Sequence, residues 1–193
     1  MLLGKQDYTG QTALLSDHRY LRVHVSGRTL LLVLGYKEAA PDGAIEIWYS
    51  AQGEVVKLQR GRIVATDGLS TDWRAVRFSR PPPDWQTLAK HGPLRYTRSR
   101  DEMPGYRFGL RDTLIATVIA APTHSLIRDI APASLHWIEE TCLPSDSREL
   151  LPPSRFAFQN MDGRETVVYS EQCLSPTLCL ALQRWPVAGG KHR

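Results

Sequence analysis

The stretch IEIWYSAQGEVVKLQRGRIVATDGLSTDW, residues 45–73, places β-branched and aromatic residues between regularly spaced glycines. Its first segment, 45–49, places Ile45, Ile47 and Tyr49 on one face and Glu46 and Trp48 on the other, with the period of two that is typical of a strand. Residues 50–53 and 59–62 contain glycine and polar residues, which turns favour because glycine accepts the positive φ of a backbone reversal. The stretch therefore predicts a three-stranded antiparallel meander with strands at 45–49, 54–58 and 63–66.

Similar segments lie on both sides of this meander. Residues 21–25 alternate apolar and polar side chains before a turn at Ser26-Gly27. Residues 30–34 are apolar on both faces, which is typical of a strand at the centre of a core. Asp162-Gly163 is the strongest short hairpin signal in the sequence. Further strands are predicted at residues 113–120, 134–141, 155–160, 165–169 and 178–182.

One short helix is predicted directly after three prolines, residues 81–83, which interrupt any strand. Asp84 suits the N-cap, and Gly92 suits the position that ends the helix. About nine or ten strands exceed what a small flat sheet holds without curling. The predicted fold class is therefore mainly β: an antiparallel β-barrel-like domain, or a sandwich, with one short helix.

The length of 193 residues predicts a single domain, 1–193, with a core at about 18–186 and a flexible tail at 187–193. Apolar residues at 42% and charged residues at 23% argue against a disordered chain or a membrane bundle. The net charge of +4 permits attraction to nucleic acid, anionic lipid or acidic polysaccharide and selects none of them. The first ten residues lack a basic region and a long apolar region, so no signal peptide is predicted in this sequence.

The three cysteines, Cys142, Cys173 and Cys179, form no C-x-x-C pair and have no histidine at zinc-like spacing. Burial as small apolar residues is the favoured interpretation. If the chain is exported, a single bridge between Cys173 and Cys179 is the alternative.

The sequence lacks the G-x-S-x-G elbow of serine hydrolases, the phosphate-binding loop and the dinucleotide-binding glycine pattern. No two of the six histidines stand at i, i+2 or i, i+4, so no local metal site is indicated. The prediction is a protein that is not an enzyme, with no catalytic, cofactor-binding or metal-binding residues.

One enzymatic alternative is a glycan-active hydrolase or lyase that uses Glu139, Glu140 or Asp67. The two glutamates follow His136 and Trp137, and an aromatic wall can raise a carboxyl pKa into the range of an acid catalyst. The competing interpretations are solvated charges for the glutamates and a turn-capping role for Asp67 and its neighbour Asp72.

A nucleic-acid-binding β domain is the less favoured alternative. Residues 94–111 interleave arginines with aromatic residues, as single-strand binders do. Asp101, Glu102 and Asp112 partly neutralise this cluster, however, and Pro104-Gly105 predicts a turn. A polar two-stranded hairpin is therefore favoured, and no nucleic-acid partner is predicted.

Four segments carry a resemblance to a known family: LLLVLGYKE, the quoted central stretch from IWYSAQG onward, SLHWIEE and FAFQNMDGRETVVYSEQCLSP. Together they resemble the YjbF/GfcB (YmcC-like) family of bacterial lipoproteins, over most of residues 20–185. Gln52 departs from the aspartate of the family pattern, in a turn that tolerates the change. The matching positions are Trp48, Tyr49, Ser50, Gly53, Gly61, Arg62, Val64, Thr66, Gly68, Leu69 and Trp73, followed by Phe158, Asp162, Gly163, Ser170, Gln172 and Pro176.

The resemblance implies a mostly antiparallel β-barrel-like domain that faces the periplasm and is tethered to the outer membrane by a lipid anchor. The leader and the lipid-accepting cysteine of the family are missing from this sequence. Members are encoded with group 4 capsule or exopolysaccharide genes, are thought to assist polysaccharide assembly or export, and have no established catalytic activity.

We therefore predict a non-enzymatic accessory protein whose partners are polysaccharide or other proteins of the export machinery. The predicted contact residues are Trp48, Tyr49, Arg62 and Trp73, because aromatic faces stack on sugar rings and arginine pairs with uronate carboxylates. The competing interpretation for each of them is packing in the core or sheet. Arg62 alone is expected to be wholly exposed.

Overall fold

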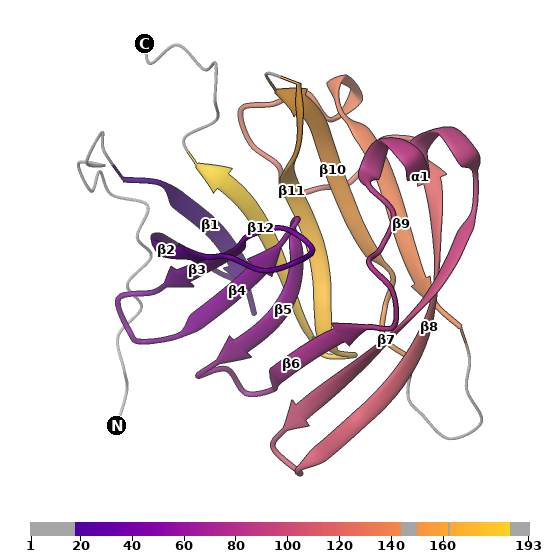
Figure 1. The fold of residues 1–193 in the computed structure, drawn as a ribbon. Helices are drawn as coiled ribbons and strands as arrows, with labels where there is room; N and C mark the ends of the chain where they lie inside the picture. Colours follow the sequence, from indigo (N-terminus) through magenta and orange to yellow (C-terminus); the bar gives the residue numbers. More distant parts are fainter. Residues whose placement is uncertain (1–17, 144–149, 162, 186–193) are drawn as a thin grey trace.

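The computed structural model describes residues 18–143, 150–161 and 163–185. Within these residues, twelve strands form one antiparallel sheet, accompanied by one α-helix and one short 3-10 helix (Figure 1). The predicted tail and the first ten residues lie outside the described part of the chain. The elements are β1 (Tyr20–Val25), β2 (Arg28–Glu38), β3 (Ile45–Tyr49), β4 (Val55–Gln59), β5 (Arg62–Asp67), β6 (Asp72–Phe78), α1 (Trp85–His91), β7 (Leu94–Met103), β8 (Arg107–Ile119), η1 (Pro132–Ser134), β9 (His136–Cys142), β10 (Ser154–Met161), β11 (Arg164–Ser175) and β12 (Leu178–Trp185).

The first and last strands of the chain, β1 and β12, pair with each other, and the sheet curls into a nearly complete barrel. The strand order is β5-β4-β3-β2-β1-β12-β11-β10-β9-β8-β7-β6, and β1 pairs with β12 from Tyr20 opposite Trp185 to Val25 opposite Leu180. Figure 1 shows β1–β5 on one side and β7–β9 on the other, with β11 and β12 between them. The two sheet edges, β5 and β6, are consecutive in the chain and therefore meet at a seam.

Side chains rather than a backbone ladder join the seam. The Trp73 amide on β6 donates to the Thr66 hydroxyl on β5 at 3.1 Å. Asp72 accepts from the amides of Gly68 and Leu69 in the connecting turn, at 3.0 and 3.2 Å. The predicted turn-capping role of Asp72 is thereby confirmed.

The interior is packed by the inward faces of the strands and by the helix. One apolar cluster joins Trp48 and Trp73 to leucines of β1, β2, β4 and β12. A second is built around Trp85 of α1, which lies 4.8 Å from the Phe156 ring between centroids. On the opposite face of β9–β12, the segment between β8 and β9 covers a third cluster, which includes Trp137 and Tyr169. The helix therefore fills interior space rather than extending the sheet.

The helix and most strands match the sequence predictions. Asp84 caps α1 by accepting from the Thr87 amide at 2.6 Å, and Gly92 ends it with φ of 75°. The hairpin of β10 and β11 is confirmed, with Gly163 at positive φ, although Asp162 lies outside the described residues. Among the described residues, no helix is long and apolar enough to cross a bilayer.

Strand β6 was missed by the sequence prediction. Its pairing with β7 shifts register between Trp73 and Ala75. This irregularity breaks the period-two alternation, so that Arg74 and Arg77 are both exposed while Trp73 is buried. A segment of this kind has the pattern of a loop, and only its neighbours show it to be a strand.

The favoured prediction for the cysteines was wrong, because Cys173 and Cys179 form a disulfide. The register of β11 and β12 places these two residues directly opposite each other. Cys142 does not take part in this bridge. The bridge that the sequence analysis gave as the alternative is therefore present in the structure.

Candidate functional site

The four predicted contact residues divide between the interior and the surface. Trp48 and Trp73 are buried in the apolar core, as the packing interpretation predicts. Tyr49 is 39% exposed on the outer face of β3. Arg62 is 4% exposed, so the prediction that it is wholly exposed was wrong. A ligand outside this barrel reaches Tyr49 but not the other three side chains.

Arg62 is buried because the start of β5 is drawn against β11. At Gly61, a Cβ atom would lie 2.5 Å from the Val167 side chain, so only glycine permits this approach. The Gln172 amide donates to the Gly61 carbonyl at 2.9 Å, and its oxygen accepts from the Ile63 amide at 2.9 Å. A side chain of β11 thus satisfies the backbone at the edge of β5, which would otherwise be unpaired.

The Arg62 guanidinium enters a buried cage of one carboxylate and three rings. It donates to Glu140 on β9, with Nε and Nη2 at 2.9 and 2.7 Å from Oε1. The guanidinium carbon lies 3.8 Å from the Trp85 ring centroid and 5.5 Å from that of Phe156, and Nη2 donates to the Tyr96 hydroxyl at 3.3 Å. Tyr96 in turn donates to Glu140. The charge of Arg62 is therefore neutralised and its face is covered by an aromatic ring, which compensates for its removal from water.

Burial and ion pairing act in opposite directions on this cage. Burial lowers the pKa of the Arg62 guanidinium, but Glu140 and Tyr96 raise it by more, so the arginine stays charged. Burial and the adjacent Glu140 carboxylate raise the pKa of Tyr96, so its phenol keeps the proton that it donates. The cage is thus a fixed ion pair rather than a source of a transferable proton.

A second buried charged group, the hairpin cluster, is formed by Arg98, Arg100, Glu102 and Asp112 on β7 and β8. Asp112 Oδ2 accepts from the Nε atoms of both arginines, at 2.9 Å each. Arg100 also pairs with Glu102. The guanidinium carbon of Arg98 lies 4.6 Å from the Trp73 ring centroid. Burial raises the pKa of the Asp112 carboxyl, but Arg98 and Arg100 lower it by more.

The hairpin cluster changes the interpretation of the arginine-rich stretch. The predicted polar hairpin is confirmed as β7 and β8, but Arg98 and Arg100 face the interior. A single-strand binder would present these side chains to phosphates. The spacing of Arg98, Arg100 and Glu102 at every second position was the available signal, since such residues share one face of a strand.

A third ion pair joins the buried Glu46 on β3 to the half-buried Arg184 on β12. The carboxylate accepts from Arg184 Nη2 at 2.7 Å and lies 3.0 Å from Lys37 Nζ. Burial raises the pKa of Glu46, but Arg184 and Lys37 lower it by more. Arg184 also lies 5.9 Å from the Trp48 ring centroid. Sequence analysis did not identify this pair, because its members are remote along the chain.

The three carboxylates of the enzymatic alternative do not share a site. Glu139 and Glu140 are adjacent on β9 and therefore point to opposite faces of the sheet. Glu140 lies in the Arg62 cage, and Glu139 pairs with Arg155 at 3.0 Å. Asp67 pairs with Arg74 at the surface. In the described part of the chain, no three His, Cys, Asp or Glu side chains gather as metal ligands would.

Two tyrosines form an exposed aromatic surface on the outer face of β2 and β3. Tyr36 is 54% exposed and Tyr49 is 39% exposed. Gly35 lies beneath the Tyr49 ring, where a Cβ atom would approach a ring carbon to 2.5 Å. The Tyr49 ring therefore packs against the backbone at Gly35 while the residue stays partly exposed. Such a surface suits stacking on a sugar ring.

Comparison with known proteins identifies a family and a similar solved structure. A family model described as "Group 4 capsule polysaccharide lipoprotein gfcB, YjbF" matches residues 15–183. No curated protein matches the chain. The crystal structure of the hypothetical lipoprotein YmcC from Escherichia coli (K12) is similar, with a TM-score of 0.64 and 19% sequence identity over 90% of this chain and 86% of that one. At this identity the likeness concerns the fold alone.

Proposed function

Because the chain belongs to the YjbF family of group 4 capsule polysaccharide lipoproteins, we propose that it is a non-enzymatic accessory protein of capsule or exopolysaccharide assembly and export. The observation that carries this proposal is the family match, which covers nearly the whole chain. Its partners in the proposal are the polysaccharide or other proteins of the export machinery.

The structure of the barrel interior supports a binding role rather than a catalytic one. Glu46, Glu140 and Asp112 are each held by arginine inside the barrel. A catalytic pair of carboxylates needs two groups that flank one bond. The buried charges are instead consumed by pairs that hold strands together, which leaves the outer face for contact with partners.

The disulfide supports the proposed location at the periplasmic side of the outer membrane. Structural disulfides form and persist in oxidising compartments and are rare in the cytosol. Cys173 and Cys179 are bridged across β11 and β12. Anchoring through a lipid, as the family description indicates, would complete the membrane association.

Tyr49 remains the proposed glycan contact among the four predicted residues, now together with Tyr36. Both rings are exposed on neighbouring strands. Trp48, Arg62 and Trp73 act in the proposal as packing residues of the barrel interior.

The test compares surface and secreted polysaccharide in a strain without the gene, the same strain complemented with the full-length protein, and the strain complemented with the Tyr36→Ala/Tyr49→Ala variant. The proposal expects loss of polysaccharide that the wild-type gene restores, with weaker restoration by the variant. Unchanged polysaccharide in the deletion strain, with the gene expressed in the parent, would contradict a role in export. Full restoration by the variant would contradict only the proposed glycan contact of the two tyrosines.

A further inference from the structure

The outer face of β6, β7 and β8 carries a groove that none of the predicted contact residues lines. The groove has a volume of about 410 Å³. The polar residues that line it include Arg77, Ser79, Thr97, Ser99, Arg111 and Thr113. Arg98, which also borders it, faces inward with Arg100, so Thr97 and Ser99, at the alternate positions of β7, point outward.

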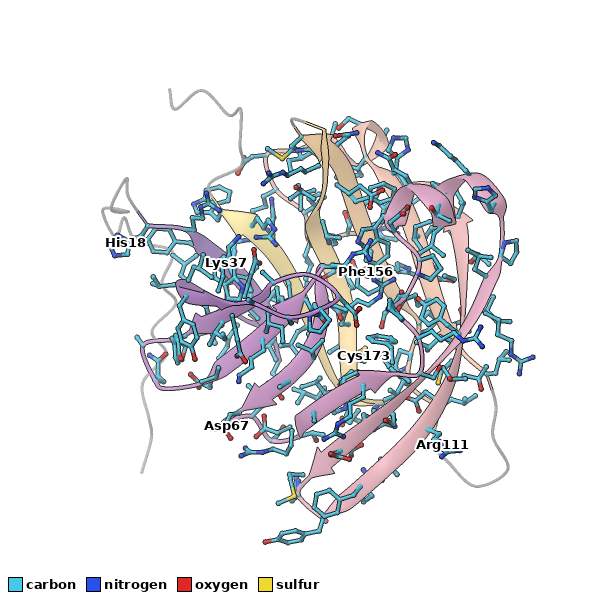
Figure 2. The ribbon with its side chains drawn as sticks, in the orientation of Figure 1. His18, Lys37, Asp67, Arg111, Phe156 and Cys173 are labelled. Carbon is cyan, nitrogen blue, oxygen red and sulfur yellow. A yellow bond between two sulfur atoms is a disulfide. The ribbon has the colours of Figure 1, made fainter. Side chains whose placement is uncertain are left out.

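The strand register orders these side chains into two parallel rows, which we call the outer groove. Ser99 on β7 lies opposite Arg77 on β6 and opposite Arg111 on β8. Neighbouring strands are about 4.8 Å apart, so the two arginines begin about 10 Å apart on either side of a hydroxyl. Figure 2 shows Arg111 projecting from β8.

The second row of the outer groove consists of hydroxyl groups alone. Thr97 lies opposite Thr113, and the Ser79 hydroxyl lies 2.7 Å from the Thr97 hydroxyl. Hydroxyl groups both donate and accept hydrogen bonds and therefore suit the hydroxyls of a sugar. A guanidinium presents a planar fork of donors that matches a carboxylate.

The charge of the outer groove is positive and accessible. The Arg77 side chain is 65% exposed and pairs with Asp101 at 2.9 Å. Arg111 is exposed on the far strand. The buried arginines of the same strands pair with Asp112 and Glu102 in the interior, whereas Arg77 and Arg111 lie on the outward face.

We propose that the outer groove binds an acidic polysaccharide, with Arg77 and Arg111 each directed at an anionic group and the hydroxyl row at the sugar hydroxyls. This inference rests on the proposed function and adds the class of glycan and a second contact surface besides Tyr36 and Tyr49. A nucleic acid is less suited, because sequence-tolerant binding of single strands uses exposed aromatic rings beside the arginines, whereas Phe78, the aromatic lining residue, is half-buried opposite the inward-facing Arg98.

The test measures binding of two probes to the purified protein by titration calorimetry at low salt. One probe is an oligogalacturonate, in which each sugar carries a carboxylate, and the other is a neutral gluco-oligosaccharide of equal length. Wild-type protein is compared with Arg77→Gln/Arg111→Gln. The matched control is Arg28→Gln/Arg164→Gln, which removes the same charge from exposed positions at the starts of β2 and β11.

Wild-type protein is expected to prefer the uronate probe, with affinity that falls as salt rises. Arg77→Gln/Arg111→Gln should bind it about tenfold more weakly, because two charge-assisted contacts are lost. The control should change the affinity less than about twofold, since long-range attraction alone is weak in salt. Both variants should melt within about 2 °C of wild type, because all four side chains lie at the surface.

Three results would each overturn the outer groove as an acidic-glycan site: equal binding of both probes or of neither, an unchanged affinity in Arg77→Gln/Arg111→Gln, or single-stranded DNA bound as tightly through the same arginines. Complementation separates this inference from the proposed function. If the deletion strain loses polysaccharide and Arg77→Gln/Arg111→Gln restores it fully, the role in export is supported and the outer groove is rejected as a glycan site. If deletion leaves the amount of polysaccharide unchanged, the role in export is rejected, while calorimetry still tests glycan binding by the outer groove.

Discussion

The Arg62 cage and the hairpin cluster both stabilise buried arginines, but their partners come from different parts of the chain. Each removes a guanidinium from water, sets it over a tryptophan ring and pairs it with a carboxylate. Arg62 and Glu140, however, are 78 residues apart, whereas Asp112 is 14 and 12 residues from Arg98 and Arg100. The ion pair of the cage therefore depends on the closed barrel, whereas the ion pairs of the hairpin cluster need only β7 and β8.

The two sites also differ in redundancy. Glu140 has one arginine, which is nearly inaccessible. Asp112 has two, and Arg100 has Glu102 as a further partner. Removing one partner of a buried pair leaves a charge without compensation, which is where most of the loss in stability arises. The cage should therefore be the more sensitive of the two regions, and the variants below test that order.

Arg62→Met should have the largest effect, a loss of about 3 kcal/mol in the free energy of unfolding, because Glu140 is left buried with Tyr96 as its remaining partner. Urea unfolding followed by tryptophan fluorescence measures it. Arg62→Met/Glu140→Gln should recover part of the loss, since the isolated charge is gone. A double variant less stable than the single would show that packing of the guanidinium, and not the orphaned carboxylate, dominates.

Asp112→Asn should cost about 2 kcal/mol, less than the cage variant, because Glu102 still compensates Arg100. The same urea series measures it. A loss larger than that of Arg62→Met would reverse the comparison and make the local hairpin the more sensitive region. Glu102→Gln serves as the matched control within the cluster, because it removes a carboxylate while the Asp112 pairs remain.

Acid should weaken the hairpin cluster through Asp112. Its pKa in the folded protein lies below the ordinary value of 3.8, so its contribution to stability is complete above pH 3.8 and is lost as pH falls through the lower folded value. Glu46, ordinarily at 4.5, behaves in the same sense. Melting temperatures between pH 6 and the acid limit should fall less steeply in Asp112→Asn than in wild type. Parallel curves would show that Asp112 does not contribute.

Arg74→Ala should have the smallest effect, below about 0.5 kcal/mol, because its pair with Asp67 is exposed on both sides. It provides the surface baseline for the two buried regions. Addition of 1 M salt should remove what difference remains, whereas the Arg62→Met loss should persist, since screening acts on exposed charges. A salt-sensitive loss at Arg62 would mean that water reaches the cage.

Much of the fold was predictable because its signals are local. The capping of α1 by Asp84, the turn at Ser26-Gly27 and the hairpin around Gly163 each depend on a few adjacent residues. Strand β6 was not predictable, because a bulge removes its alternation. The resemblance to the family was also available from the sequence, and Gly61 and Gln172 within its motifs prove to hold β5 against β11.

Little of the candidate site was predictable, because it depends on which faces meet. Tyr49 was named from its aromatic character and is exposed, while Tyr36 beside it was overlooked. Arg62 was expected at the surface, since an arginine next to a turn glycine is ordinarily solvated. Its true partners on α1, β7 and β9 come from distant parts of the chain.

The sequence by itself determined most of the strands and turns, the helix and the family, because alternation, glycine conformation and capping act over a few residues. Only the tertiary structure decided that β1 pairs with β12, that Cys173 faces Cys179, and that Arg62 lies inside while Arg77 and Arg111 lie outside. The physical reason is that these outcomes follow from register and closure of the sheet. Both are set by the free energy of burying all the inward faces together, and no short segment of the sequence determines that free energy.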